Sequence, residues 1–218
     1  MFQALNKHRT QDSLAAGMRL AAMGVVALVL VGCGGKGESV LMDLRSAAPT
    51  AVPAKPANDL TVAVANFDDS ALTDPKRLGS RSHLGGGTSH FDLADGKPGE
   101  VVSQLVADTL KQRGWHVEKA GADGKAQATI SGKILELSVN AKSSFGSTDI
   151  TSASKLVVEA VNAADGSKVR MTLSGAGAQT VVWFEPGDAH ALLAETVSES
   201  LEKLIANTKV ENNALRLK

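Results

Sequence analysis

Residues 150–161, ITSASKLVVEAV, and residues 168–174, KVRMTLS, alternate between apolar and polar side chains, as strands with one buried face do. The segment between them contains Asp165 followed directly by Gly166. An Asp-Gly pair is a strong signal for a tight turn between antiparallel strands. We therefore predict a β-hairpin over residues 150–174.

Three further strands are predicted before this hairpin. Residues 60–67 (LTVAVANF) alternate large apolar with small or polar side chains and should form the first strand. Residues 115–119 should form a short strand, and residues 126–139 a longer one. The apolar phase of the longer strand moves from Ile134 to Leu135, so we expect a β-bulge within it.

Two one-sided helices are predicted. In residues 98–113 the apolar side chains fall on one helical stripe, with Pro98 near the start and Gly114 after the end. Residues 188–207 repeat apolar positions at spacings of three and four. The order of these elements predicts an α+β domain over residues 59–208, with a mostly antiparallel sheet and two helices packed on one face.

A long irregular connection is expected between residues 68 and 97. Connections of this length are often functional or mobile. We predict that it is a partner- or ligand-contacting loop with solvated histidines, and its candidate residues are Arg77, Arg81, His83, His90 and Phe91. The sequence lacks the Gly-Lys-Ser/Thr ending of a phosphate loop. Two histidines are also fewer than the three or four ligands of a zinc site, so no metal is predicted.

No catalytic residue is predicted elsewhere in the sequence. Asp68 and Asp69 follow a strand and are expected to form a turn. The glycines at 175 and 177 lack the third glycine of a dinucleotide site, and no serine lies in a Gly-x-Ser-x-Gly motif. Residues 181–186 (VVWFEP) form an apolar aromatic cluster. We expect this cluster to pack in the core, and the alternative is a partner surface.

The first 32 residues have the features of an export signal, with basic side chains followed by the apolar run of residues 20–32. This run is shorter than the roughly 20 residues of a transmembrane helix. It ends in Leu30-Val31-Gly32-Cys33, which resembles the lipobox of bacterial lipoproteins. The resemblance implies cleavage before Cys33, and a diacylglycerol and an N-acyl chain on Cys33. We expect no other cofactor.

The sequence after the lipobox predicts how the domain is attached. Gly34 stands where an Asp would retain a lipoprotein in the inner membrane, so we expect a lipid anchor in the outer membrane facing the periplasm. Residues 33–58 contain Gly, Ala and Pro and are expected to form a flexible tether that holds the domain away from the bilayer. Residues 209–218 are expected to be a C-terminal tail.

The charge balance excludes one class of partner. Lys7, Arg9 and Arg19 outnumber Asp12 in the leader, so the 23 basic and 23 acidic side chains of the whole chain become 20 and 22 once the leader is removed. A protein that binds nucleic acid normally has a clustered basic excess. We therefore expect no nucleic-acid partner.

Four stretches of the sequence resemble the YajG-like group of envelope lipoproteins. They are residues 62–67 (VAVANF), 77–83 (RLGSRSH), 96–100 (GKPGE) and 140–145 (NAKSSF). The resemblance covers residues 59–208. It implies a fold similar to that of the curli-secretion lipoprotein and the amino-terminal domain of TolB, and it implies no activity.

These observations favour a non-enzymatic accessory or interaction module of the cell envelope, with an envelope protein as its partner. The alternative is a lipid- or small-molecule-handling auxiliary component of an envelope transporter. That alternative would need an apolar cavity between the helices and the sheet. A hydrolase that uses His83 and His90 is a third hypothesis.

Overall fold

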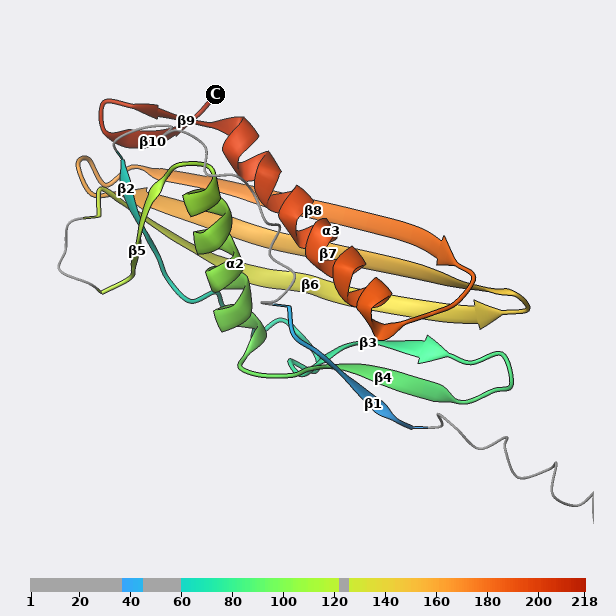
Figure 1. Cartoon of the computed structure of the whole chain (residues 1–218). Helices are drawn as coiled ribbons and strands as arrows, with labels where there is room; N and C mark the ends of the chain where they lie inside the picture. The colour runs from blue at the N-terminus through green and yellow to red at the C-terminus, as the bar shows by residue number, and fades with distance from the viewer. Residues whose placement is uncertain (1–36, 45–59, 122–125) are drawn as a thin grey trace, which may run out of the picture. The chain divides into compact units, whose positions relative to one another are not determined.

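The computed structural model describes residues 37–44, 60–121 and 126–218 (Figure 1). Its longest strands are β6 (Ala128–Ser144), β7 (Ser147–Asn162) and β8 (Lys168–Val181), which pair antiparallel in this order. The hairpin predicted around Asp165 is confirmed, because Val161 pairs with Lys168 across the turn. The predicted bulge is also present, since the register of β6 and β7 shifts between Ile134 and Glu136.

Five shorter strands extend the sheet beyond the other edge of β6. Along the first part of β6, β2 (Thr61–Val64) pairs parallel with it, and β5 (His116–Lys119) pairs parallel with β2. Along its second part, β3 (Arg77–Ser82) pairs parallel with β6 and antiparallel with β4 (Thr88–Leu93). β1 (Ser39–Met42) pairs parallel with β4 and forms an edge of the described sheet.

Two helices cover one face of this sheet, α2 (Pro98–Gln112) and α3 (Pro186–Asn207). They contact each other, α3 lies over β7 and β8, and α2 lies against β2 and β5 (Figure 1). The predicted α+β class is confirmed. The long ladders are antiparallel, and the parallel pairs are confined to the short strands. Among the described residues, neither helix is both long and apolar enough to cross a bilayer.

Small side chains allow α3 to approach the sheet closely. The hydroxyls of Ser152 and Thr196 are hydrogen-bonded at 2.5 Å, and those of Ser154 and Ser200 at 2.7 Å. A Cβ atom added to Gly175 would lie 2.3 Å from the Thr196 carbonyl oxygen. This part of the helix–sheet interface therefore holds no cavity of ligand size.

Three expectations about irregular segments are wrong. Residues 39–42, predicted as part of the tether, form β1, and Met42 is buried. The connection predicted over residues 68–97 contains the β3–β4 hairpin, in which Phe91 and Leu93 are buried. Strands of four to six residues contain too few alternations for periodicity to identify them.

The third wrong expectation is the C-terminal tail predicted over residues 209–218. It is a hairpin of β9 (Thr208–Glu211) and β10 (Ala214–Leu217). Its two central residues are Asn212 and Asn213, which have φ angles of 53° and 57°. Both therefore take the left-handed conformation that a tight hairpin turn of type I′ requires, and Asn tolerates this conformation better than most residues.

Candidate functional site

Three connections meet at one end of the sheet, on the right of Figure 1. They are residues 83–87 between β3 and β4, the two-residue turn Phe145-Gly146 between β6 and β7, and residues 182–185 between β8 and α3. Together they line a cavity of about 450 Å³. Its lining residues are Arg81, His83, Leu84, Gly85, Ser143, Ser144, Gly146, Ser147, Thr148, Val182, Trp183 and Phe184.

Arg81 organises the polar part of this cavity. Its guanidinium carbon lies 4.1 Å from the centre of the Phe184 ring, which is a cation–π geometry. Its Nε donates to Ser143 Oγ at 3.0 Å, and Ser143 is in turn 3.1 Å from Thr148 Oγ1. Partial burial lowers the pKa of Arg81, but a guanidinium stays charged at neutral pH. The three elements are thus joined around one fixed positive charge.

The ring of Phe184 packs against the ring of Phe91. The two rings are stacked, with 6.1 Å between their centres and 28° between their planes. Phe91 is fully buried, so it is a core residue and not the loop residue that the sequence predicted. Because Phe91 fixes Phe184, it also fixes the ring on which Arg81 lies.

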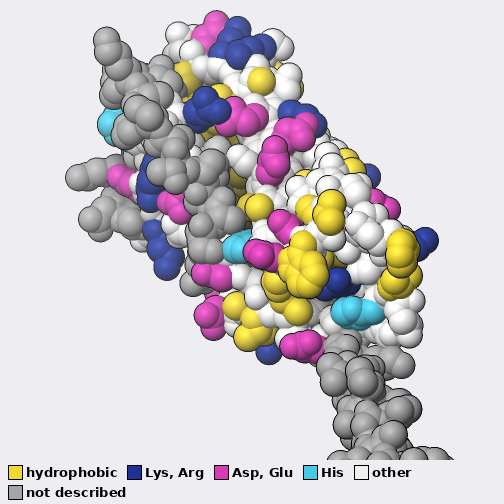
Figure 2. Space-filling view, turned by 45° about the vertical axis from the view of Figure 1, so that its right-hand side comes forward, with side chains coloured by type: hydrophobic (Ala, Val, Ile, Leu, Met, Phe, Trp, Pro, Cys, Tyr) yellow, Lys and Arg dark blue, Asp and Glu magenta, His cyan; other side chains and the backbone are white. Residues whose placement is uncertain are grey.

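Four large hydrophobic side chains are exposed at this end of the sheet. The exposed fraction is 63% for Leu84, 95% for Phe145, 85% for Val182 and 81% for Trp183. Figure 2, in which this end is turned forward, shows hydrophobic side chains at the surface here among charged ones. The core packing expected for residues 181–186 is therefore wrong for Val182 and Trp183, and the alternative of a surface applies to them.

We call Leu84, Phe145, Val182 and Trp183, together with Arg81, the tip surface. Sequence reasoning selected Arg81 and His83 but missed Leu84 and the turn that carries Phe145. The signal for this turn was present, because an aromatic residue within Ser-Ser-Phe-Gly-Ser is an apolar side chain in a segment of turn composition.

The chain enters the described domain beside the tip surface. The Gly37 N–H donates to the Thr88 carbonyl at 2.7 Å, and Ser39 pairs with His90. Thr88 is the first residue of β4 after the connection that carries Leu84. Gly37, the first residue that the structure describes, therefore lies at this end of the domain.

The two candidate histidines do not form one site. His83 Nε2 lies 2.7 Å from the hydroxyl of Ser89. His90 is the next residue along β4, so its side chain points to the other face of the sheet, and its Nδ1 is buried without a hydrogen-bond partner among the described residues. Over all the residues that the structure describes, no group of three or more His, Cys, Asp or Glu side chains could hold a metal ion.

Arg77 and the paired aspartates have structural contacts. Arg77 Nε is 3.2 Å from Asp92 Oδ1 on β4. The Ser39 hydroxyl, and then Arg77, hold the pKa of Asp92 below its ordinary value. Asp68 accepts from the Ser70 N–H at 2.9 Å, and the Ser70 hydroxyl and N–H, with Lys133, lower its pKa to about 2. Asp68 thus closes a turn, as predicted.

Asp69 Oδ2 accepts from Gly99 N at 3.2 Å and joins this turn to the start of α2. A second cavity, of about 600 Å³, lies between α2, β2 and β5. It is lined by charges of both signs, including Glu100, Lys111 and Lys119, and by none of the predicted site residues. The predicted lipidation residue Cys33 and the recognition residues Leu30, Val31 and Gly32 lie outside the described residues.

No family model and no curated protein matches the sequence. Solved structures of similar fold include protein XCC0632 of Xanthomonas campestris, of the family designated DUF330, with 10% identity, 77% of this chain and 92% of that chain covered, and a TM-score of 0.49. The PelC dodecamer of Paraburkholderia phytofirmans has 15% identity, with 69% of this chain and 93% of that chain covered and a TM-score of 0.36.

Lipoprotein GNA1162 of Neisseria meningitidis has 11% identity, with 67% of this chain and 99% of that chain covered and a TM-score of 0.32. The resemblance to the YajG-like group stays a prediction. At these values, none of the names assigns a function to this chain.

Proposed function

We propose that this chain is a lipid-anchored, non-enzymatic accessory module of the bacterial cell envelope, and that the tip surface is its contact surface. The lipid is attached at Cys33, within Leu30-Val31-Gly32-Cys33, and Gly34 directs the protein to the periplasmic face of the outer membrane. The observation that carries the proposal is the gathering of Leu84, Phe145, Val182 and Trp183 in one exposed surface.

Exposed apolar side chains that lie together mark contact sites, whereas single ones are common on any protein surface. The tip surface combines its apolar side chains with an ordered polar group. Arg81 is held against Phe184 and Ser143 before any partner arrives, so little side-chain entropy is lost when it binds. This arrangement supports a binding role.

The contacts of His83 and His90 do not support the hydrolase hypothesis. His83 and the Ser89 hydroxyl form the kind of pair from which a nucleophile could be made. However, Ser89 is only 3% exposed, so its hydroxyl cannot reach a substrate in this conformation. His90, the other candidate, faces away from this pair.

The carrier alternative requires an apolar cavity between the helices and the sheet. The space between α3 and the sheet is filled, because Gly175 and Gly177 leave no room even for an added methyl group beside Thr196. The cavity of about 600 Å³ does lie between α2 and the sheet, but it is open at the surface and is lined by charges of both signs, including Glu100 and Lys111. The cavity of the tip surface lies at the end of the sheet and is also open. Neither is the apolar cavity that this alternative requires.

Photo-crosslinking in intact cells tests the proposal. A photoreactive residue is placed at position 84 or 183 of the tip surface, and at position 217 as a control. Leu217 is also an exposed leucine, but it belongs to β10 near the opposite end of β7. Discrete adducts with protein or with lipid are expected from positions 84 and 183, and none from position 217. The same adducts from all three positions, or none from the tip, would contradict the proposed contact surface.

A further inference from the structure

The distance between the anchor and the sheet is short. Gly37 is hydrogen-bonded to Thr88 at the tip end, and Cys33 precedes it by four residues. Four residues of extended chain span at most about 14 Å. The spacer expected over residues 33–58 is therefore replaced by a few residues, and a lipid on Cys33 would bring the bilayer close to the tip surface.

The shape of the tip surface suits a lipid interface better than a protein surface with fixed pockets. Leu84, Phe145 and Trp183 belong to three separate connections that project from the end of the sheet (Figure 1). Phe145 occupies the apex of a two-residue turn and has most of its ring area in solvent. Separate apolar side chains on projecting turns can each enter a lipid interface, whereas a protein partner would need a matching pocket for each of them.

The chemistry of the tip surface also suits lipid headgroups. Trp is enriched where a protein meets the boundary between acyl chains and water. The cavity beside Trp183 is lined by Arg81, His83 and several hydroxyls, and no carboxylate lines it. A guanidinium and hydroxyl donors are suited to the phosphate of a phospholipid. The nearby acid Asp188 accepts from the Glu185 N–H at 2.8 Å and serves the start of α3.

We infer that the tip surface rests on the membrane, with Leu84, Phe145 and Trp183 in the lipid interface and Arg81 at the headgroup phosphates. The inference rests on the proposed function, because the lipid on Cys33 is what places the bilayer at this end. It names the partner of the tip surface as a phospholipid bilayer. A protein partner would then bind to another part of the domain.

The two tryptophans of the chain provide the test. Trp183 belongs to the tip surface, whereas Trp115 is buried next to β5 near the start of β6, roughly 50 Å away at the usual rise per strand residue. The full lipoprotein is reconstituted in phosphatidylethanolamine–phosphatidylglycerol vesicles, with plain or brominated acyl chains. Bromine quenches tryptophan only at short range.

We expect Trp183 emission to be blue-shifted in plain vesicles and to lose intensity in brominated ones. Trp183→Phe leaves Trp115 alone and should give equal emission in both kinds of vesicle. Phe145→Ser and Leu84→Ser should reduce the loss of Trp183 emission, and the matched control Leu217→Ser should not. Equal Trp183 emission in plain and brominated vesicles would overturn the inference.

Labelling the cells that produce the lipoprotein with a fatty-acid probe separates failure of the proposed anchor from failure of the inference. If the protein is not labelled, the proposed anchor is wrong and the inference falls with it. If the protein is labelled at Cys33 and Trp183 is not quenched, the anchor stands and the inference alone is overturned. In that case, a protein adduct from position 183 in the crosslinking experiment would identify the occupant of the tip surface.

Discussion

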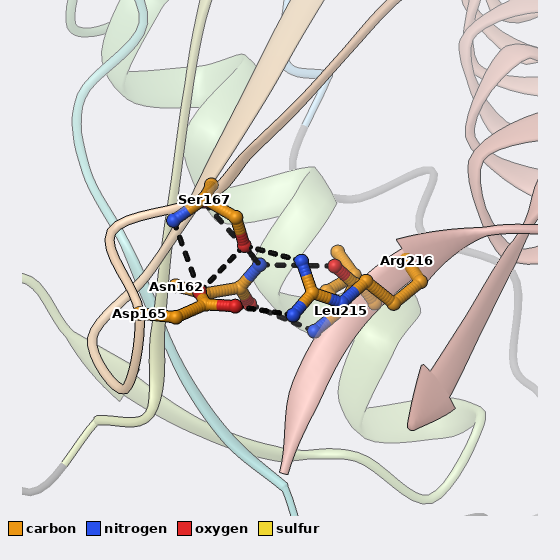
Figure 3. A network of polar contacts seen from close by, with 5 residues as sticks. All are labelled: Asn162, Asp165, Ser167, Leu215 and Arg216. Carbon is orange, nitrogen blue, oxygen red and sulfur yellow. Dashed lines mark hydrogen bonds and ion pairs between the residues drawn. The ribbon is translucent and has the colours of Figure 1, made fainter. Parts of the chain in front are cut away.

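The side chain of Asn162 pairs with the main chain of Leu215 as a strand residue would (Figure 3). Asn162 Nδ2 donates to the Leu215 carbonyl at 3.0 Å, and the Leu215 N–H donates to Asn162 Oδ1 at 2.7 Å. Both residues are buried. This contact joins the β9–β10 hairpin to the end of β7, 53 residues earlier in the chain.

Replacing Asn162 by Ala should destabilise the protein strongly. The buried N–H and C=O of Leu215 would lose their partners, and each such loss costs about 1–3 kcal/mol, so about 2–6 kcal/mol is expected in total. Urea unfolding measures the change. Asn207→Ala is the control, because the Asn207 side chain donates to Lys203 at an exposed site. A change as small as that of the control would show that β10 docks without this pair.

The neighbouring carboxylate predicts a pH dependence. The Ser167 hydroxyl first, then Arg216 and the Ser167 N–H, hold the pKa of Asp165 well below its ordinary value (Figure 3). A carboxyl whose pKa is lower in the folded protein stabilises the fold above the pKa of the unfolded chain. This contribution is lost as the pH falls through the folded value.

The difference in unfolding free energy between wild type and Asp165→Asn should therefore be present at pH 7 and shrink as the pH falls below about 4. Thermal or urea unfolding across this range measures it. Ser167→Ala should weaken the same dependence, because Ser167 contributes the largest hydrogen bond to the carboxylate. A difference that stays constant from pH 7 to pH 3 would contradict the assigned contacts.

The close approach of α3 predicts which glycines can be replaced. At Gly175, an Ala side chain would meet the Thr196 carbonyl at 2.3 Å, so the helix or the strand must move. A destabilisation of about 1–3 kcal/mol is expected from such overpacking. Gly187→Ala, in the first turn of α3, meets nothing within 4 Å and should be neutral or stabilising. Equal effects of the two substitutions on the midpoint of urea unfolding would disprove the close contact.

The contact between Arg81 and Phe184 predicts an energetic coupling. In a double-mutant cycle of Arg81→Gln and Phe184→Leu, the coupling energy should be about 1 kcal/mol, since the cation lies over the ring at a partly buried site. Urea unfolding of the four proteins measures it. A second double-mutant cycle, of Arg81→Gln and Leu72→Ala, serves as the control, because Leu72 does not line the cavity that Arg81 lines. A coupling no larger than that of the control would remove Arg81 as the organiser of the tip surface.

The sequence predicted the elements whose pattern is local and long. Residues 150–174 form the expected hairpin because their alternation and the Asp165-Gly166 turn both act between neighbours in the chain. It did not predict the surroundings of Arg81, since Phe184 and Ser143 lie about 100 and 60 residues further along the chain and meet it only through the pairing of β3 with β6. Phe91 was misplaced because it is buried in β4, a strand of six residues that is too short for its alternation to identify.

If the leader is cut before Cys33 as proposed, the position of β1 at the edge of the sheet predicts an order of events during maturation. A protease that cuts before Cys33 must reach that bond at the bilayer surface, and Ser39, six residues later, is part of the sheet once β1 has paired. We expect cleavage to precede this pairing, so inserting about four Gly-Ser residues after Gly35 should leave the rate of leader removal in a pulse-chase experiment unchanged. A faster rate would mean that the docked strand competes with cleavage. Because β1 pairs only with β4 among the described strands, the other strands can pair beforehand, and the sheet would gain β1 only after the leader has gone.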